Sequence, residues 1–486
     1  MDTKILGEHM KKVYNGVHLY ININNLNKII KDDEKRHYDL CRTFHALDTF
    51  TAAMEKFANE FCDVEVEKFT TSRLHFYIPI DNNEDAVTTE MLELIAFSKV
   101  LSGFINKNSK YQSLINFKIG AGADFGKYTE FEFEDNETGF KEMTTIGSPA
   151  NRAAKLQSVC DDGKILISKE VFERLPILMR SLFFVNHKAS LELRKKYTEL
   201  AAYETDINSI HVKLSDVYSE REKRSIDYAS TVVQSLNLDD MEISDANKKL
   251  DFSNLSIKNS KELESAAILF SDIRGFTKKV DESNLAEMKQ LTQTVLAMMN
   301  KEVRNRNGVH VQFQGDRESA VFNQYNSESA DYALRAVLCA MRMLDRLDEI
   351  NKYRESRLDI GIGCSIGNTY ATRIGMRGNK FNVTMGETVK EADDAEDNVA
   401  GTHINSPLTE IAITAEMYDY LVKLPGKDSE FIKESFNKCR SYKGKNYYIS
   451  TTRFSEYQKM AITCSKEQNA SRASNNGGLK PWGNFK

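Results

Sequence analysis

The chain has 486 residues, of which 41% are hydrophobic and 28% are charged, a composition typical of a globular protein with two domains. A net charge of −5 argues against generic nucleic-acid binding, and no window approaches the twenty apolar residues of a membrane-spanning helix. Seven cysteines without a CxxC pair are typical of unpaired thiols in a reducing compartment, so we expect a cytoplasmic protein.

The first 205 residues alternate between strand-like and helix-like patterns. One helix is indicated by Phe44, Leu47, Phe50 and Met54, whose spacing places them on one helical face. The predicted elements are a strand at 17–23, a helix at 43–61, a hairpin at 64–77, a helix at 87–105, a strand at 117–126 and a helix at 149–159.

The same order of elements returns in the second part of the chain. The predicted elements there are a strand ending at 270, a helix at 285–303, a hairpin at 309–322, a helix at 330–347, a strand at 358–367 and a helix after Gly386. Four landmarks recur about 240 to 250 residues apart: Asn22 and Asp272, Ser72 and Asp316, Gly126 and Gly367, and Gly147 and Gly386. This recurrence predicts an internal duplication.

The duplication divides the chain into four segments. We expect one copy at 10–205, a polar linker at 206–261 that is helical over 212–236, a second copy at 262–455, and a mobile tail at 465–486. The linker beyond residue 239 is expected to be an irregular connector.

Two acids stand at comparable places in the second copy. Asp272 follows the apolar run 266–269 within Phe-Ser-Asp-Ile-Arg-Gly-Phe-Thr, and Asp316 lies at the tip of a predicted hairpin. A lone aspartate at such a place often only caps a turn. Two together can hold hard divalent cations, which suit chemistry on a triphosphate. The first copy has Asn22 and Ser72 instead.

The segment 270–277, the Gly-Asp hairpin and the later Gly-x-Gly strand together resemble a class III nucleotidyl cyclase domain. That family comprises adenylate and guanylate cyclases and the bacterial pyrimidine cyclases of antiphage (Pycsar) defence. The resemblance covers both copies. It implies an α/β fold of the α+β, ferredoxin-like type, with an antiparallel sheet and helices on one face, and two tandem domains that pack as an intramolecular pseudo-dimer.

The resemblance also implies a division of labour between the copies. Asp272, the carbonyl group of Ile273, and Asp316 match the positions that bind one or two Mg²⁺ or Mn²⁺ ions. Asn151 and Lys155 in the first copy match the Asn and Arg that stabilise the transition state in this family. Lys155 carries a compact ammonium group where the family has the planar guanidinium of Arg. The second copy has Lys390 and Asp394 there, so one working site and one degenerate pocket are expected. Without the resemblance, Asn151 and Lys155 could be a solvated helix face.

Phosphate and base recognition complete the implied site. Arg377 matches a phosphate-binding Arg. Lys68 and Thr144 match the base-recognising positions, with Thr145 as an alternative to Thr144. These residues leave adenine and a pyrimidine both open. A run at 194–196 (Arg-Lys-Lys) can reach a triphosphate, but a solvated hairpin face is the simpler interpretation.

The expected activity is conversion of CTP or UTP to the 3′,5′-cyclic monophosphate and diphosphate. The product would be a messenger, cCMP or cUMP, for a cyclic-nucleotide-binding effector in antiviral defence. A cytosolic adenylate cyclase making cAMP is the alternative, and a non-catalytic nucleotide sensor is a second one. The lack of a membrane segment and of a recognisable sensory module favours the pyrimidine cyclase, and a monomeric pseudo-dimer is expected.

Overall fold

The computed structural model describes residues 13–34, 36–62, 64–70, 72–80, 84–111, 115–135, 137–194, 201–275, 285–325, 331–401 and 409–461. The expected tail at 465–486 and the cations Lys195 and Lys196 lie outside these residues. Within the described ranges, no helix has the length and apolar character needed to cross a membrane.

The N-terminal half is built on one sheet with the strand order β2-β3-β1-β4-β6-β8-β7, and β5 pairs with β4. Its strands are β1 (Val13–Ile23), β2 (Glu65–Thr70), β3 (Arg73–Pro79), β4 (Ile119–Asp135), β5 (Phe140–Ile146), β6 (Lys164–Ser168), β7 (Phe184–Val185) and β8 (Ala202–Asp206). Its helices are α1 (Leu26–Asp33), α2 (His37–Phe61), α3 (Glu84–Lys107), α4 (Ser148–Ser158), α5 (Lys169–Phe172), α6 (Ile177–Arg180) and α7 (His187–Arg194).

The C-terminal half repeats this topology with the strand order β11-β12-β10-β13-β15-β17-β16, and β14 pairs with β13. Its strands are β10 (Asn259–Ile273), β11 (Val309–Gln314), β12 (Arg317–Asn323), β13 (Ile360–Ile374), β14 (Phe381–Met385), β15 (Glu410–Thr414), β16 (Lys438–Tyr442) and β17 (Lys445–Ser450). Its helices are α10 (Leu285–Asn305), α11 (Tyr332–Asn351), α12 (Glu387–Asn398), α13 (Ala415–Leu421) and α14 (Lys427–Ser435). The two matching strand orders agree with an internal duplication.

The sheets differ from the expected antiparallel arrangement in two respects. Each is mixed, because β4 runs parallel to β6 and β13 runs parallel to β15. Helices also cover both faces. Ala121 and Ala123 of β4 face the core that contains α2 and α3, whereas the intervening Gly122 faces α4. Alternate residues of a strand point to opposite faces, so α4 lies across the sheet from α2 and α3.

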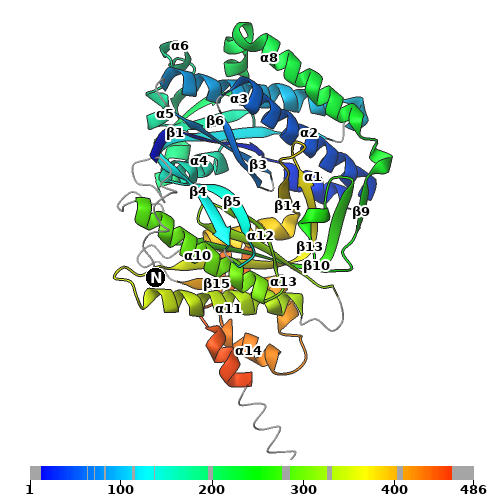
Figure 1. The fold of residues 1–486 in the computed structure, drawn as a ribbon, viewed down its shortest axis with the longest axis vertical. Helices are drawn as coiled ribbons and strands as arrows, with labels where there is room; N and C mark the ends of the chain where they lie inside the picture. The colour runs from blue at the N-terminus through cyan, green and yellow to red at the C-terminus, as the bar shows by residue number, and fades with distance from the viewer. Residues whose placement is uncertain are drawn as a thin grey trace, which may run out of the picture.

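Each half extends a hairpin into the other half, and these two arms hold the halves together (Figure 1). The β4–β5 arm places Phe131, Phe133 and Ile146 in the hydrophobic core of the C-terminal half. The β13–β14 arm places four side chains in the core of the N-terminal half: Tyr370, Ile374, Val383 and Met385. Burying one such side chain contributes about 1.5–3 kcal/mol, so the arms form a substantial interface.

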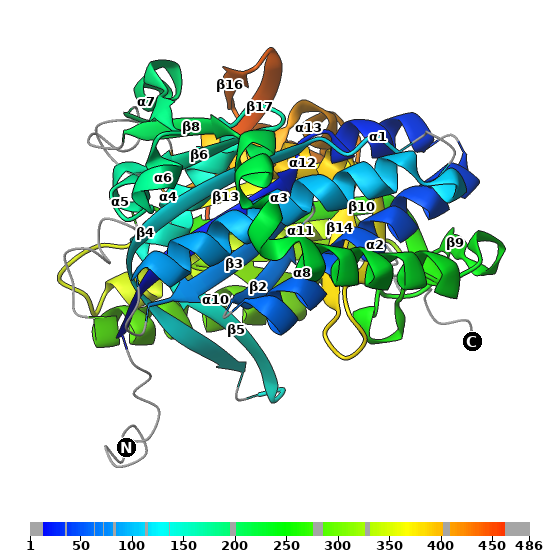
Figure 2. The same cartoon turned by 90° about the horizontal axis from the view of Figure 1, so that it is seen from above.

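The segment between the halves is more structured than the sequence predicts. Helix α8 (Ile207–Ser235) is capped at its N-terminus by Asp206, whose carboxylate accepts a hydrogen bond from the backbone N–H of Asn208 (2.8 Å). It packs across α2 and α3, as Figure 2 shows from above. The expected irregular connector contains β9 (Glu242–Asp245), which pairs in parallel with β10. A four-residue strand with an acid at each end and one apolar residue carries too weak a pattern to be found from sequence.

Candidate active site

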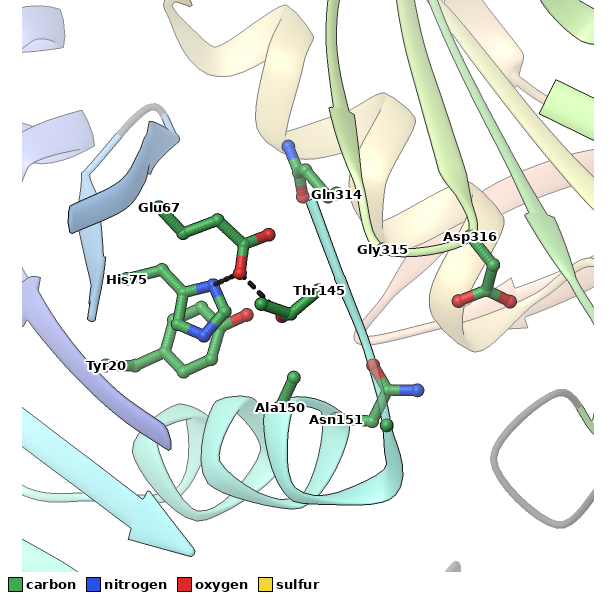
Figure 3. A pocket seen from close by; sticks show the side chains of 10 residues that line it. Tyr20, Glu67, His75, Thr145, Ala150, Asn151, Gln314, Gly315 and Asp316 are labelled. Carbon is green, nitrogen blue, oxygen red and sulfur yellow. Dashed lines mark hydrogen bonds and ion pairs between the residues drawn. The ribbon is translucent and has the colours of Figure 1, made fainter. Parts of the chain in front are cut away.

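A pocket lies at the seam between the halves, and both halves contribute to its wall (Figure 3). The N-terminal half supplies residues from β1, β2, β3, β5 and the start of α4, and the C-terminal half supplies the turn between β11 and β12. The lining residues are Tyr20, Glu67, His75, Thr145, Gly147, Ala150, Asn151, Gln314, Gly315 and Asp316. Glu67, His75 and Tyr20 group on one side of the pocket, and the Asp316 carboxylate lies on the other.

The acidic side is formed by the end of β10 and the β11–β12 turn. Strand β10 pairs with β12 through Ser271 and Glu318. Asp272 directly follows Ser271 and Asp316 precedes Glu318 by two residues, so both aspartates lie at the same end of the sheet. Gly315 has a φ of 66°, a conformation that glycine adopts without strain, and this turns Asp316 toward the pocket. The two aspartates are therefore brought together.

The Asp316 carboxylate on this side is buried and only partly satisfied by hydrogen bonds. Asp316 is 4% exposed, and its Oδ2 atom has no hydrogen-bond partner among the described residues. Burial, and after it the neighbouring Asp272 carboxylate, raises the pKa of Asp316 well above its usual value. Two adjacent carboxylates with an unsatisfied oxygen are a donor set that fits a hard divalent cation. Class III cyclases in general use such ions.

The opposite side is a row of three hydrogen-bonded side chains. The Glu67 carboxylate lies 3.1 Å from His75 Nδ1, and His75 Nε2 lies 2.9 Å from His18 Nδ1. Tyr20 stacks on His75 with ring centroids 4.1 Å apart. Glu67, His75 and His18 bring ligand atoms within 4.8 Å of one another. Both nitrogens of His75 are already engaged in the row, so we interpret it as a hydrogen-bonded chain rather than a chelate.

The Glu67 carboxylate is the fixed anion of this chain. It accepts hydrogen bonds from the hydroxyl groups of Thr144 (2.8 Å) and Thr145 (2.6 Å). Burial on its own would raise the pKa of Glu67, but His75 and the surrounding donors outweigh it and hold the pKa below its usual value. Burial and His75 lower the pKa of His18 to about 3, so His18 is neutral. The pocket therefore offers a charged acceptor at this end.

Helix α4 supplies the remaining polar groups. It starts directly after Gly147, where a Cβ atom would lie 2.8 Å from the carbonyl oxygen of Lys127. Asn151 lines the pocket from the first turn of the helix. One turn later, the Lys155 ammonium lies 3.5 Å from the Asp397 carboxylate of α12, an ion pair that crosses between the halves. This end of α4 thus faces the acid-bearing half.

Comparisons with known proteins agree with this arrangement. Residues 258–449 match the family described as the adenylate and guanylate cyclase catalytic domain. These residues form a class III nucleotide cyclase domain. The chain is also 24% identical over 457 residues to a uridylate cyclase of Pseudomonas aeruginosa, a match that covers 90% of this chain and 82% of that protein.

Two further relatives define the extent of the similarity. A terminal-differentiation-specific adenylate cyclase of Dictyostelium discoideum is 30% identical over 135 residues, which is 27% of this chain and 6% of that protein. The crystal structure of a class III adenylyl cyclase-like ATP-binding protein from Pseudomonas aeruginosa superposes with a TM-score of 0.65 at 20% identity. That superposition covers 87% of this chain and 90% of the other. It shows that both halves share the fold of that protein.

The cyclase structure brings some of the sequence-predicted site residues together. Asp272, Ile273 and Asp316 lie at one end of the C-terminal sheet, and Asn151 lines the same pocket as Asp316. The 2% exposed Ile273 ends β10 next to Asp272. The N-terminal half has the uncharged Asn22 and Ser72 at the positions of the two acids.

Lys68 and Thr144 lie next to the pocket wall rather than in it. Lys68 is 4% exposed, and its ammonium group contacts the carbonyl group of Phe313 and lies 2.7 Å from Glu142 Oε1. Thr144 donates to Glu67 and accepts a hydrogen bond from the backbone N–H of Gly315 (3.0 Å). Their neighbours Glu67 and Thr145 are the residues that line the pocket.

The other expected cations are exposed. Arg377 lies in the turn between β13 and β14. That turn docks on α2 through Glu55, which accepts a hydrogen bond from the backbone N–H of Met376 (2.6 Å). Arg194 is exposed at the end of α7. The interaction of either arginine with phosphate stays a prediction.

The lining residues that the sequence reasoning missed include Tyr20, Glu67 and His75. Glu67 lies in a β-bulge, because the pairing of β2 with β3 shifts by one residue between Val66 and Lys68. A bulge moves one extra side chain to the other face of a strand, and the residue pattern of this segment does not predict the bulge.

Proposed function

We propose that the protein converts a pyrimidine nucleoside triphosphate to its 3′,5′-cyclic monophosphate and diphosphate, with UTP as the preferred substrate. In this reaction the ribose 3′ oxygen bonds to the α-phosphorus and the bond to the departing diphosphate breaks. The observation that carries the proposal is the pocket itself, which has Asp316 at one end with Asp272 beside it, the Glu67 carboxylate at the other end and Asn151 in its wall.

Asp272, Asp316 and the carbonyl group of Ile273 would hold one or two Mg²⁺ or Mn²⁺ ions. A bound divalent ion lowers the pKa of a coordinated hydroxyl group and screens the charge of a phosphate. Asn151 would orient the ribose. The Lys155 ammonium would leave Asp397 and neutralise phosphate charge, aided by Arg377 if the β13–β14 turn brings it within reach. Preorganised donors of this kind typically contribute about 10²–10³ in rate each.

The base-facing end supports uracil by its hydrogen-bonding chemistry. Uracil presents an N3–H donor between two carbonyl groups, and a carboxylate such as Glu67 accepts from that donor. Cytosine and adenine place an unprotonated ring nitrogen at the corresponding edge, which a carboxylate repels. Guanine also presents a ring N–H that a carboxylate can accept from, so GTP is among the substrates tested below. The uridylate cyclase relative supports the same choice.

An adenylate cyclase is the second candidate, because the 30% identical relative has that activity by name. In either case the cyclic nucleotide would be a messenger for a cyclic-nucleotide-binding effector in the cytoplasm. We propose antiviral defence as the setting, which rests on the resemblance to the bacterial pyrimidine cyclases alone.

The deciding experiment is to incubate the purified protein and Mn²⁺ separately with UTP, CTP, ATP and GTP, and to identify the products by mass spectrometry. We expect cUMP as the main product. If cCMP were the main product, the protein would still be a pyrimidine cyclase, but Glu67 would not select uracil through its N3–H group. Exclusive cAMP or cGMP formation would refute the pyrimidine proposal, and no cyclic product from any triphosphate would favour a nucleotide sensor.

A further inference from the structure

One buried carboxylate of the C-terminal half, Glu396, has no part in the proposed chemistry and yet contacts both acid-bearing segments. It lies on α12 and is 2% exposed. Helix α12 packs closely on β13 at Gly363, where a Cβ atom would lie 2.3 Å from the Glu396 nitrogen. This glycine therefore fixes how near Glu396 comes to the sheet.

Two arginines converge on Glu396 from the two acid-bearing segments. Arg274 follows Asp272 by two residues, and its Nη1 lies 2.7 Å from Glu396 Oε1. Arg317 directly follows Asp316, and its Nη2 lies 2.8 Å from Glu396 Oε2. One carboxylate thus joins the end of β10 to the start of β12.

Each arginine has further contacts that limit its movement. Arg274 lies 3.5 Å from Asp272 and donates to the carbonyl group of Ala400 (2.8 Å). Its guanidinium lies over Gly361, where a Cβ atom would be only 1.8 Å from Nη2. The guanidinium of Arg317 stacks on the Phe270 ring at 4.1 Å and lies 2.6 Å from Asp393. The two glycines of the Gly361-Ile-Gly363 segment therefore make room for this network.

The N-terminal half keeps the packing of this network, and Arg73 stands where the other half has Arg317, but the Arg274–Glu396 pair is replaced by uncharged residues. Asn24 stands where the other half has Arg274, and Gln157 stands where it has Glu396. Asn22 donates to Asn24 Oδ1 (2.8 Å), and so does Gln157 (3.3 Å). Gly120 and Gly122 of β4 make room for Asn24 and Gln157, as Gly361 and Gly363 do in β13.

The Arg274–Glu396 ion pair is thus present in the half that has the paired aspartates, and the uncharged Asn24–Gln157 pair replaces it in the half that lacks them. A merely structural link between strand and helix would not need charge, because the neutral version holds the same elements together. The charge is needed where two like-charged carboxylates must be kept close and correctly spaced. Ligand groups of a functional site must be held to about 0.5 Å.

We propose that Glu396 is a positioning residue for the divalent-cation site. Through Arg274 and Arg317 it sets the distance between Asp272 and Asp316 and holds both carboxylates in place against their repulsion. This inference rests on the proposed function, because it takes Asp272 and Asp316 to be the cation ligands. It assigns to Glu396 no contact with substrate.

The test measures Mn²⁺ affinity of the full-length protein without nucleotide, by titration followed by electron paramagnetic resonance. We expect Glu396→Gln, which introduces the N-terminal half's residue, to weaken Mn²⁺ binding about 10–100-fold, as loss of a residue that orients metal ligands typically does. Glu391→Gln is the matched control on the same helix. Its carboxylate pairs with Lys445 rather than with the two arginines, so its Mn²⁺ affinity should stay that of the wild type.

A double variant separates positioning from folding. Glu396→Gln combined with Arg274→Asn reproduces the neutral pair of the other half, so it should melt closer to the wild type than Glu396→Gln alone and still bind Mn²⁺ weakly. Return of Mn²⁺ affinity together with the melting temperature would overturn the inference, as would wild-type affinity in Glu396→Gln. If the wild-type protein bound no Mn²⁺, or bound it equally after Asp316→Asn, the cation site of the proposed function would itself be wrong.

Discussion

His310 on β11 connects the two halves, and its removal should weaken the seam in a pH-dependent way. His310 Nδ1 lies 2.8 Å from Glu318 Oε1 in its own half, and Nε2 lies 2.8 Å from Glu142 Oε2 on the β5 arm of the other half. Burial on its own would lower the pKa of His310, but the two carboxylates outweigh it and raise the pKa to about 10. Burial also raises the pKa of Glu318. We nevertheless take the charged pair to be present, because each imidazole nitrogen faces a carboxylate oxygen at 2.8 Å.

The magnitude follows from two independent arguments. A pKa moved from 6.5 to about 10 corresponds to an upper limit of about 5 kcal/mol, at roughly 1.4 kcal/mol per pKa unit. Removing one partner of a buried ion pair costs about 3–5 kcal/mol. Because the folded-state pKa is raised, this contribution is fully present below about pH 6.5 and is lost as the pH rises toward 10. His310→Gln should therefore lower the free energy of unfolding by about 3–5 kcal/mol at pH 6 and by clearly less at pH 9.

The assay is urea unfolding of wild type and variant at both pH values, and the difference between the two proteins is compared so that other titrating groups cancel. His187→Gln, at an exposed histidine at the start of α7, is the control and should change little at either pH. An equal loss at pH 6 and pH 9 would refute the charged interpretation of His310. If His310→Gln lowered the free energy of unfolding by less than about 1 kcal/mol at both pH values, His310 would not stabilise the contact between the halves.

Four further outcomes are expected. Asp316→Asn should raise the melting temperature in EDTA, because it relieves the repulsion between the buried Asp316 carboxylate and Asp272. The same variant should reduce cyclase activity at least about 10³-fold. A lower melting temperature would contradict the expected repulsion between Asp272 and Asp316. Lys155→Ala should lower kcat about 10²-fold while Lys155→Arg retains activity, and a loss below threefold would exclude Lys155 from the site. Glu67→Gln should reduce the preference for UTP over CTP about tenfold or more, measured as the ratio of kcat/KM values, and an unchanged ratio would exclude Glu67 from base recognition. Initial rates should rise linearly with protein concentration, whereas a quadratic rise would mean that two chains form the site.

The order of elements could be predicted because both halves have clear periodicity. The strand that carries Asp272 contains the apolar run 266–270, and the first strand of the hairpin before Asp316 alternates apolar and polar residues; both lie where the sequence places them. Strand β9 was missed because four residues with an acid at each end and one apolar residue give no such signal. Helices α4 and α12 were predicted, but their place on the opposite face of each sheet was missed, because the contact of Gly122 with α4 depends on tertiary packing.

The candidate site was only partly predictable for a physical reason of the same kind. The bulge at Val66 and Lys68 changes which side chain of β2 faces the pocket, so Glu67 lines it and Lys68 lies in the seam. The partner of Lys68 is Glu142 on another strand, and the partner of Lys155 is Asp397 in the other half. Local sequence patterns carry no information on such long-range partners.

The central claim is that the acids of one half and Asn151 of the other serve the same nucleotide. A crystal structure with Mn²⁺ and a non-reactive UTP analogue measures this most directly. We expect the metal signal between the Asp272 and Asp316 carboxylates, the ribose within hydrogen-bond distance of Asn151, and the uracil edge at Glu67. A nucleotide bound with its α-phosphate away from both aspartates, or with its ribose away from Asn151, would contradict the account.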